Sequence, residues 1–334
     1  MKKSMSLIAV HAAFGTEEAC LAYLEAARWP EGVRCFACGS SKVSKFVTNE
    51  TEREVTDDHG NVIETKRVPA RQLYQCNAEG CRFQFSAKSG TIFDKSHLPL
   101  STWFQAVAIV VNAKKSVSAK QMERDLGVNY RTAWFLNHRI REAMRSDAGL
   151  FGGEVELDAT HVGGRYDPRR KRAPYDKQAV MGVLQRGNDE QVSQVQAFMV
   201  TKETAKVVDN ALAERVTMSA ELYSDEHAAY RHLKQTRTHT IVVHSKGEYV
   251  RGRAHTNSLE NFWSLFKRQI IGQHHFVSVK HLQRYLDECQ FKFNNRDAEN
   301  LFGVVITLLV MGTALRYNTL IGKQASDDVL GPTV

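Results

Sequence analysis

The sequence predicts a multidomain α/β protein. Its 334 residues exceed the usual size of one hydrophobic core, and a prior of about 100 to 200 residues per domain suggests two or three units. Two close cysteine pairs occupy the first quarter of the chain, and strand-like and helix-like patterns alternate from about Gly152 onward. The formal net charge of +8 and the pI of about 9.1 favour a polyanionic partner.

The first 30 residues are predicted to form a helical leader. The apolar start faintly imitates a signal peptide, but His11 interrupts it and no clear small-residue cleavage site follows. The apolar stretch 301–315 is shorter than the 18 or more residues of a membrane span and contains Gly303 and Gly312. We therefore expect a buried helix there, no membrane partner, and a cytoplasmic location, nucleoid-associated if the polyanionic partner is DNA.

Four of the six cysteines form two close pairs, Cys35 with Cys38 and Cys76 with Cys81. Thiolates two residues apart can share one tetrahedral ion through a tight turn, and the distant pair closes the site. Disulfides are the alternative, but Cys20 and Cys289 lie outside any pairing and nothing indicates secretion. A zinc ribbon with structural Zn²⁺ is therefore predicted, with strands near 43–47 and 73–75 and a long hairpin tip or mobile insertion at 48–66.

The stretch 118–144 resembles a helix-turn-helix. Ser118 can cap a first helix that carries Met122 and Leu126 inward, residues 127–129 make the turn, and Tyr130 starts a second helix. The polar side chains of the second helix and its cap are expected to approach phosphates or base edges: Asn129, Tyr130, Arg131, His138, Arg139 and Arg141. An ordinary helical hairpin with a solvated basic side remains the alternative.

From Gly152 onward the order of elements is β-β-β-α-β-α-β, which is the order of an RNase H-like fold. The strands are expected at 154–162, 178–186, 191–200, 221–224 and 240–243, and the helices at 201–216 and 226–235. A strongly amphipathic helix follows, with Thr256 or Asn257 as its cap. The predicted fold class is thus an RNase H-like domain and a catalytic helix, preceded by a zinc ribbon and a helix-turn-helix.

Three acidic residues are placed on separate elements of this domain. Asp158 lies on the first strand, Asp225 follows the fourth strand, and Glu260 lies near the start of the amphipathic helix. In an RNase H-like sheet the first and fourth strands are neighbours, so the carboxylates can converge. Two Mg²⁺ or Mn²⁺ ions about 3.5 to 4 Å apart would suit them, since hard cations prefer oxygen ligands.

Together these pieces resemble a bacterial insertion-sequence transposase of the DDE type with an N-terminal zinc ribbon. The matching motifs span Cys35 to Arg296: the cysteine pairs, the Asp158 strand followed by Gly163-Gly164, Ser224-Asp225-Glu226 with Tyr230, HSKGEYVRG, HTNSLENFWSLFKR and HLQRYLDE. The resemblance implies metal-dependent DNA cleavage followed by strand transfer. The implied partners are the terminal inverted repeats of the element, target DNA, and further copies of the chain in a synaptic complex.

Two features depart from the family pattern or leave it ambiguous. Ala159 stands where members often carry a second acid after the first catalytic aspartate, so Asp158 alone is expected to bind metal there. Some relatives use an asparagine as the third ligand, and both Asn257 and Glu260 are available. Glu260 is preferred because a carboxylate supplies charge as well as an oxygen; Asn257 would ligate more weakly or cap the helix.

Basic residues near these motifs are predicted to contact DNA. The run Arg169, Arg170, Lys171 and Arg172, in a loop that contains prolines, fits a phosphate clamp, although a solvated loop explains it equally well. The other expected DNA contacts are Lys246, Arg251, His255, Lys267 and Arg268.

The expected domains are a helical leader (1–30), a zinc ribbon (31–95), a DNA-binding helix-turn-helix (96–148), an RNase H-like catalytic domain (149–300), and a C-terminal helix and tail (301–334). Two alternatives to a transposase are a DNA-binding regulator with an inactive RNase H-like domain and a stand-alone nuclease of the same fold. The intact acidic triad argues against the regulator, and the two DNA-binding modules argue against the nuclease.

Overall fold

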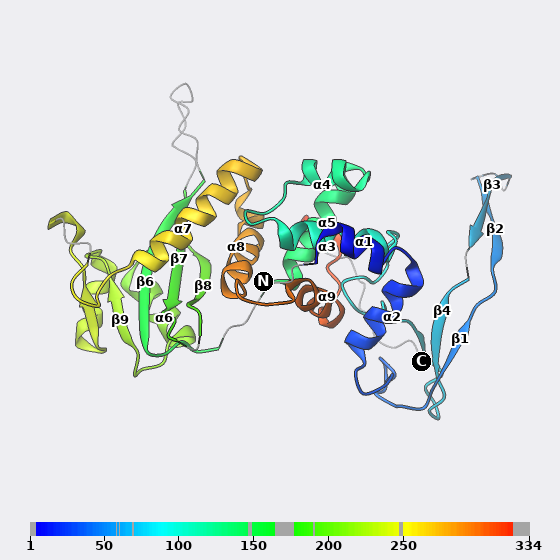
Figure 1. Ribbon diagram of the computed structural model, residues 1–334, viewed down its shortest axis with the longest axis horizontal. Helices are drawn as coiled ribbons and strands as arrows, with labels where there is room; N and C mark the ends of the chain where they lie inside the picture. Colours follow the sequence, from blue (N-terminus) through cyan, green and yellow to red (C-terminus); the bar gives the residue numbers. More distant parts are fainter. Residues whose placement is uncertain are drawn as a thin grey trace, which may run out of the picture. The chain divides into compact units, whose positions relative to one another are not determined.

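The computed structural model describes residues 5–57, 59, 61–68, 70–145, 149–163, 177–189, 191–246 and 250–322 (Figure 1). The chain forms two compact units. The ribbon unit comprises Ile8–Phe104 and Gly303–Val334, and the sheet unit comprises Met1–Leu7 and Gln105–Phe302. Three helices each contain a unit boundary: α1 (Leu7–Ala13), α3 (Leu100–Asn112) and α9 (Leu301–Met311).

The ribbon unit opens with two short helices, α1 (Leu7–Ala13) and α2 (Glu17–Arg28). A three-stranded antiparallel sheet follows in the order β1 (Val43–Val47), β4 (Gln72–Cys76) and β5 (Gln84–Phe85). Its core is small and consists mainly of Cys35, Tyr74, Cys76 and Phe85, with Trp29 packed against them. A core this small needs additional stabilisation, such as a bound metal ion or disulfide bonds.

The segment predicted as a hairpin tip or mobile insertion forms a two-stranded hairpin. Strand β2 (Thr51–Thr56) pairs antiparallel with β3 (Val62–Val68) and forms a sheet of its own. Most described side chains of both strands are exposed, so the hairpin carries almost no core.

The apolar stretch near the C-terminal end forms helix α9, as predicted, and a short helix α10 (Tyr317–Leu320) follows it. Among the side chains of α9, Phe302, Val305, Ile306, Leu309 and Val310 are buried. Within the described ranges no single helix has both the length and the apolar composition of a membrane span; α1 and α2 pass that test only as a pair bent by 96°.

The sheet unit is built on five strands in the order β10-β9-β6-β7-β8. Their bounds are β6 (Glu154–Val162), β7 (Gln178–Gln185), β8 (Gln194–Val200), β9 (Glu221–Ser224) and β10 (His239–Ile241). Strands β6, β7 and β8 pair antiparallel, whereas β9 is parallel to both β6 and β10. The predicted strands therefore all occur. Strand β8 starts three residues later than predicted because Asn188 and Gln191 close a turn before it.

Helices cover both faces of this sheet (Figure 1). One apolar core joins Val155 and Leu157 of β6 to α6 (Ala205–Arg215) and the 3₁₀ helix η1 (Ala228–Gln235). The other core joins Val162, β7 and β8 to α7 (Asn257–Gln269) and α8 (Val279–Asn294). Successive side chains of a strand alternate between faces, so the even-numbered residues of β6 face α7.

Helix α8 covers the edge strand β8 through side-chain amides. The backbone N–H groups of Val195, Ala197 and Met199 donate to Asn294, Gln290 and Gln283 at 2.8, 2.8 and 3.0 Å. Asn294 and Gln283 donate in return to the carbonyls of Val195 and Ala197. The polar groups that an open edge would expose are thus paired within the unit.

Two helices, α4 (Ala119–Leu126) and α5 (Tyr130–Ala143), occupy the predicted positions. The Ser118 hydroxyl caps α4 by accepting from the Gln121 N–H at 3.1 Å, and the Asn129 side chain caps α5 through the Thr132 N–H at 2.9 Å. Gly127 ends α4 with φ of 65°, a left-handed conformation that favours glycine.

Three of the residues predicted to approach phosphates or base edges are buried in the structure. His138, Arg139 and Arg141 are 0%, 5% and 3% exposed, because α5 packs against α8 along this side. The Arg141 Nε donates to the Glu288 carboxylate at 2.8 Å, and its guanidinium lies over the Tyr285 ring. Arg139 lies over the Phe135 ring. Tyr130 and Arg131 remain exposed.

Glu288 is the charged centre of this helix pair. It is 1% exposed and accepts hydrogen bonds from Arg141, from Lys292 at 2.7 Å and from the Ser116 hydroxyl at 2.8 Å. Burial alone would raise the pKa of Glu288, but the charges of Lys292 and Arg141 hold it well below its usual range.

We expect Glu288→Gln to lower the free energy of unfolding by about 3 kcal/mol, because it leaves the buried Arg141 without its counter-charge. Chemical denaturation of the full chain, followed by its tryptophan fluorescence, measures this free energy. The control is Glu123→Gln, whose partner Lys120 is 67% exposed, and which should cost less than about 1 kcal/mol. Equal losses in both variants would contradict the prediction.

The lowered pKa of Glu288 also makes the stability of the fold depend on pH. Its contribution to stability is complete above the pKa of an unfolded glutamate and is lost as the pH falls toward the lower folded value. Glu288→Gln should therefore flatten the acid limb of the stability profile.

Candidate functional site

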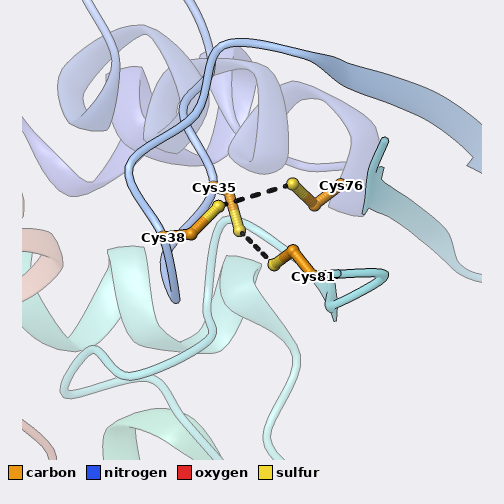
Figure 2. Close-up of side chains that lie close together, drawn as sticks. All are labelled: Cys35, Cys38, Cys76 and Cys81. Atoms are coloured by element: carbon orange, nitrogen blue, oxygen red, sulfur yellow. Dashed lines mark hydrogen bonds between the residues drawn. The ribbon is translucent and has the colours of Figure 1, made fainter. Parts of the chain in front are cut away.

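The four predicted zinc ligands come together in the ribbon unit (Figure 2). The Sγ atoms of Cys35 and Cys81 lie 3.7 Å apart, and those of Cys38 and Cys76 lie 3.6 Å apart. All four Sγ atoms lie within 4.8 Å of one another. Tetrahedral zinc with bonds of about 2.3 Å holds its sulfur ligands about 3.8 Å apart, so the quartet fits a structural Zn²⁺.

Tight turns place these thiols. Gly39 adopts φ of 72° just after Cys38, and its N–H donates to the Cys35 carbonyl at 2.9 Å. The backbone N–H of Ser40, followed by the neighbouring thiol of Cys81, lowers the pKa of Cys38 to about 7. One ligand is therefore readily available as a thiolate near neutral pH.

The three predicted catalytic acids occupy three neighbouring elements of the sheet unit. Asp158 lies in β6, Asp225 directly follows β9, and Glu260 lies in the first turn of α7. Strand β9 pairs with β6 in a register that sets Tyr223 beside Glu156, so the chain reaches Asp225 alongside Asp158. In the part of the chain that the structure describes, only the cysteine quartet forms a group of three or more His, Cys, Asp or Glu residues whose ligand atoms lie within 4.8 Å of one another.

The carboxylate of Asp158 is held by two donors. Its Oδ1 accepts from the backbone N–H of Ala159 at 2.8 Å, and its Oδ2 accepts from the indole Nε1 of Trp263 at 3.0 Å. Burial, followed by the like charges of Asp225 and Glu260, raises the pKa of Asp158 to about 7. A bound cation would offset this repulsion and favour the charged carboxylate.

Gly182 lets the indole reach Asp158. It pairs with Asp158 across β6 and β7, and a Cβ atom there would lie 2.6 Å from the Trp263 ring and 2.8 Å from Leu259. No other residue leaves room for α7 at this distance from the sheet.

Helix α7 is capped by Glu156, a residue of β6, and by neither of the predicted caps. The Glu156 Oε2 accepts from the backbone N–H groups of Ser258 and Leu259, both at 3.0 Å. Thr256 makes no capping hydrogen bond; its hydroxyl donates to the Glu260 Oε1 at 3.0 Å. Sequence reasoning missed Glu156, although a glutamate on the helix-facing side of a strand is a signal, since burying its charge requires partners.

The other oxygen of Glu156 faces two bases. Its Oε1 accepts from Arg186 Nε at 2.8 Å and lies 3.2 Å from His255 Nδ1. Arg186 also donates to the carbonyls of Arg253 and His255. The guanidinium thus connects the loop before α7 to the sheet. His255 was predicted to line the DNA path, and its ring lies beside Glu156.

A groove of about 810 Å³ contains Asp158 and Glu260. Two residues predicted to contact DNA, Lys267 and Arg268, line the same groove and are exposed. Asn257 lies in a different cavity of about 1040 Å³, on the side of α7 that carries Ser258 and Asn261.

The remaining predicted DNA contacts are distributed over the sheet unit. Arg251 donates to the Ile241 carbonyl at 2.8 Å and is exposed. Lys246 belongs to the 3₁₀ helix η2 (His244–Lys246), and its side chain lies outside the described part of the structure. The run 169–172 lies outside the described residues altogether.

Comparison with known families gives two matches along the chain. Residues 15–84 match the transposase zinc-ribbon domain, and residues 150–294 match the ISXO2-like transposase domain. The first match covers the cysteine quartet and the second covers Asp158, Asp225, Asn257 and Glu260.

A curated relative comes from Halobacterium salinarum and is described as an uncharacterized protein in transposable element ISH50. It is 27% identical over 282 residues, which span 79% of this chain and 86% of that protein. Among solved structures, a simian T-cell lymphotropic virus intasome in complex with PP2A regulatory subunit B56 gamma aligns at 14% identity and a TM-score of 0.24. That alignment covers 48% of this chain and 57% of the other.

We expect Cys76→Ser to abolish zinc binding and to unfold the small ribbon core, because Cys76 is both a ligand and a buried core residue. Elemental analysis of the purified chain, with limited proteolysis of the ribbon unit, measures both effects. Cys20→Ser is the control, since Cys20 lies outside the quartet. A full zinc equivalent in Cys76→Ser would contradict the assignment.

Proposed function

We propose that this chain, an insertion-sequence transposase with an N-terminal zinc ribbon, cuts DNA at the ends of its element and joins them to target DNA. The proposed catalytic residues are Asp158, Asp225 and Glu260, which would hold two Mg²⁺ or Mn²⁺ ions. When bound, such ions lower the pKa of water and stabilise charge on phosphate oxygens.

The proposal includes an RNase H-like fold for the catalytic domain. It is supported by the sheet order β10-β9-β6-β7-β8, in which three antiparallel strands precede two parallel ones in sequence. The boundaries at residues 30, 95, 148 and 300, and assembly into a synaptic oligomer, belong to the same proposal.

The observation that carries the catalytic proposal is the placement of the Asp158 carboxylate beside Asp225, through the β6–β9 register, and beside Glu260 in one groove. A carboxyl whose pKa is raised to about 7 by burial and by two nearby acids is poorly suited to an ordinary structural role. Glu288, a buried structural acid of the same unit, has two cationic partners instead. Asp158 has two hydrogen-bond donors but neighbours of its own charge, which suits a site that gains stability from cations.

Position favours Glu260 over Asn257 as the third ligand. Glu260 shares the groove with Asp158 and affects its pKa, and its carboxylate is 46% exposed and steadied by Thr256. Asn257 is the first residue of α7 and lines the other cavity. We therefore assign Asn257 no metal.

DNA is proposed to contact α4 and α5 as a helix-turn-helix and to enter the groove beside Asp158. Tyr130 and Arg131 are exposed near the start of α5, while Lys267 and Arg268 line the groove. Cations at these places can pair with phosphates, which makes binding dependent on salt.

We expect Asp158→Asn, Asp225→Asn and Glu260→Gln each to reduce strand cleavage about 1000-fold, because each removes a cation ligand worth several kcal/mol in the transition state. Cleavage of labelled duplexes that carry the element's ends measures this, and DNA binding should persist. Asn257→Ala should retain cleavage to within about tenfold, as a lost helix-start residue costs far less.

The control is Asp209→Asn, an exposed acid of α6 on the opposite face of the sheet, which should cleave like the parent. Joined products in the parent reaction support strand transfer, whereas cut products alone would indicate a stand-alone nuclease. Sequence-specific binding without any metal-dependent cleavage would replace the proposal with a DNA-binding regulator.

A further inference from the structure

Helix α7 ends in an unusual backbone. It continues into a π-helix, η3 (Ile270–His274), and His275 then adopts φ of 57° and ψ of −46°. The Phe276 N–H donates to the His274 carbonyl at 2.5 Å, which closes a γ-turn around His275. A π-helical turn is rare and a classic γ-turn at a residue other than glycine is rare and strained, and both features concentrate at functional sites.

Buried contacts hold this segment, 270–276, from the inside. The His274 Nε2 lies 3.2 Å from the Ser116 hydroxyl, and its ring packs edge-on against Tyr285. Ile270 is 6% exposed in the same core as α7 and α8. The strained turn is therefore anchored by its neighbours.

The outer side of the segment is apolar and open. Ile271 is 69% exposed and Phe276 is 68% exposed. An amphipathic helix normally turns such side chains inward, as α7 does with Phe262 and Phe266. The strained backbone thus presents to solvent two side chains that water disfavours.

The segment extends the catalytic groove. Ile271, Gly272 and Gln273 line the same groove as Asp158 and Glu260. The cations of this groove are Lys115, Lys267 and Arg268. The groove therefore holds Glu260 near the start of α7, cations along its lining, and Ile271 beyond the end of α7, with Phe276 following outside the lining.

We propose that segment 270–276 takes nucleobases of the DNA strand whose phosphate lies at the carboxylates, with Phe276 stacking on a base and Ile271 wedged beside it. The inference rests on the proposed function. Aromatic rings stack on any base, and apolar wedges unstack base steps and bend the duplex. The lysines and the arginine would meanwhile pair with the phosphates of that strand.

Unstacking of the bases can be measured by fluorescence under conditions in which the DNA is not cleaved. Duplexes ending in the element's terminal repeats, with 2-aminopurine placed in turn at each nucleotide near the end, are bound in the absence of divalent metal. The parent chain should raise the fluorescence at one or two positions. Phe276→Ala and Ile271→Ala should lose most of that rise at saturating protein, whereas Met218→Ala, equally exposed at 68% but outside the segment, should keep it.

Cleavage supplies the second measurement. Phe276→Ala should cut a fully paired duplex about tenfold more slowly, in line with the free energy of one stacked base. A duplex with a mismatch at the fluorescent position should restore most of the rate, and Phe276→Trp should behave like the parent on both substrates. A variant that merely folds poorly would be slow on both.

Three results would overturn the inference. The first is the absence of a fluorescence rise with the parent chain. The cleavage assay would then still test the proposed function separately. The second is equal impairment of Phe276→Ala on paired and mismatched duplexes. The third is an unchanged fluorescence rise in the variants combined with a changed oligomeric state by sedimentation, which would assign the segment to a second copy of the chain.

Discussion

The geometry of the acidic site depends on the contact between the Glu156 carboxylate and the start of α7. This carboxylate is fully buried in β6, where one oxygen accepts two backbone N–H groups from the start of α7 and the other accepts from Arg186. A buried charge is tolerated only with partners of this quality, and a helix N-terminus, with its free N–H groups and partial positive charge, is a suitable one. Because Glu156 and Asp158 lie on one face of the strand, the contact that docks the helix also sets Glu260 relative to Asp158.

The rest of the sheet unit reinforces this docking from both sides. Gly182 leaves space for Trp263, whose indole N–H then reaches the Asp158 carboxylate. Helix α8 binds the edge strand β8 through side-chain amides, so the sheet that carries Asp158 has a fixed edge. At the far end of α7, the segment 270–276 is pinned through His274. One helix therefore leads from Glu260 in the groove to the strained segment 270–276, and its position is decided by polar contacts as much as by the apolar core.

Local patterns in the sequence were sufficient for much of this arrangement. The cysteine spacing predicted the quartet, and local patterns predicted the five strands of the large sheet and the amphipathic helix that carries Glu260, whereas β5 was not predicted. The failures involve partners distant in sequence. Arg141 is buried because Glu288, 147 residues away, neutralises it, and α7 is capped by Glu156, 102 residues before Ser258. Neither pairing leaves a periodic signal. The γ-turn at His275 had no local signal either, since the strain is sustained by tertiary contacts and not by a turn-forming residue.

We infer that Glu156 positions α7, the helix that carries the proposed catalytic residue Glu260, and the Mg²⁺ dependence of strand cleavage tests this most directly. If Glu156→Gln loosens α7, Glu260 is held less well beside Asp158, and the Mg²⁺ concentration for half-maximal cleavage should rise about tenfold, as is common when groups that orient metal ligands are replaced. DNA affinity should stay unchanged, and Glu154→Gln, a substitution of the outer partner of Arg186, should shift the Mg²⁺ requirement much less. A Glu156→Gln protein that is folded, binds DNA and cleaves it with the parent's Mg²⁺ requirement would contradict the account.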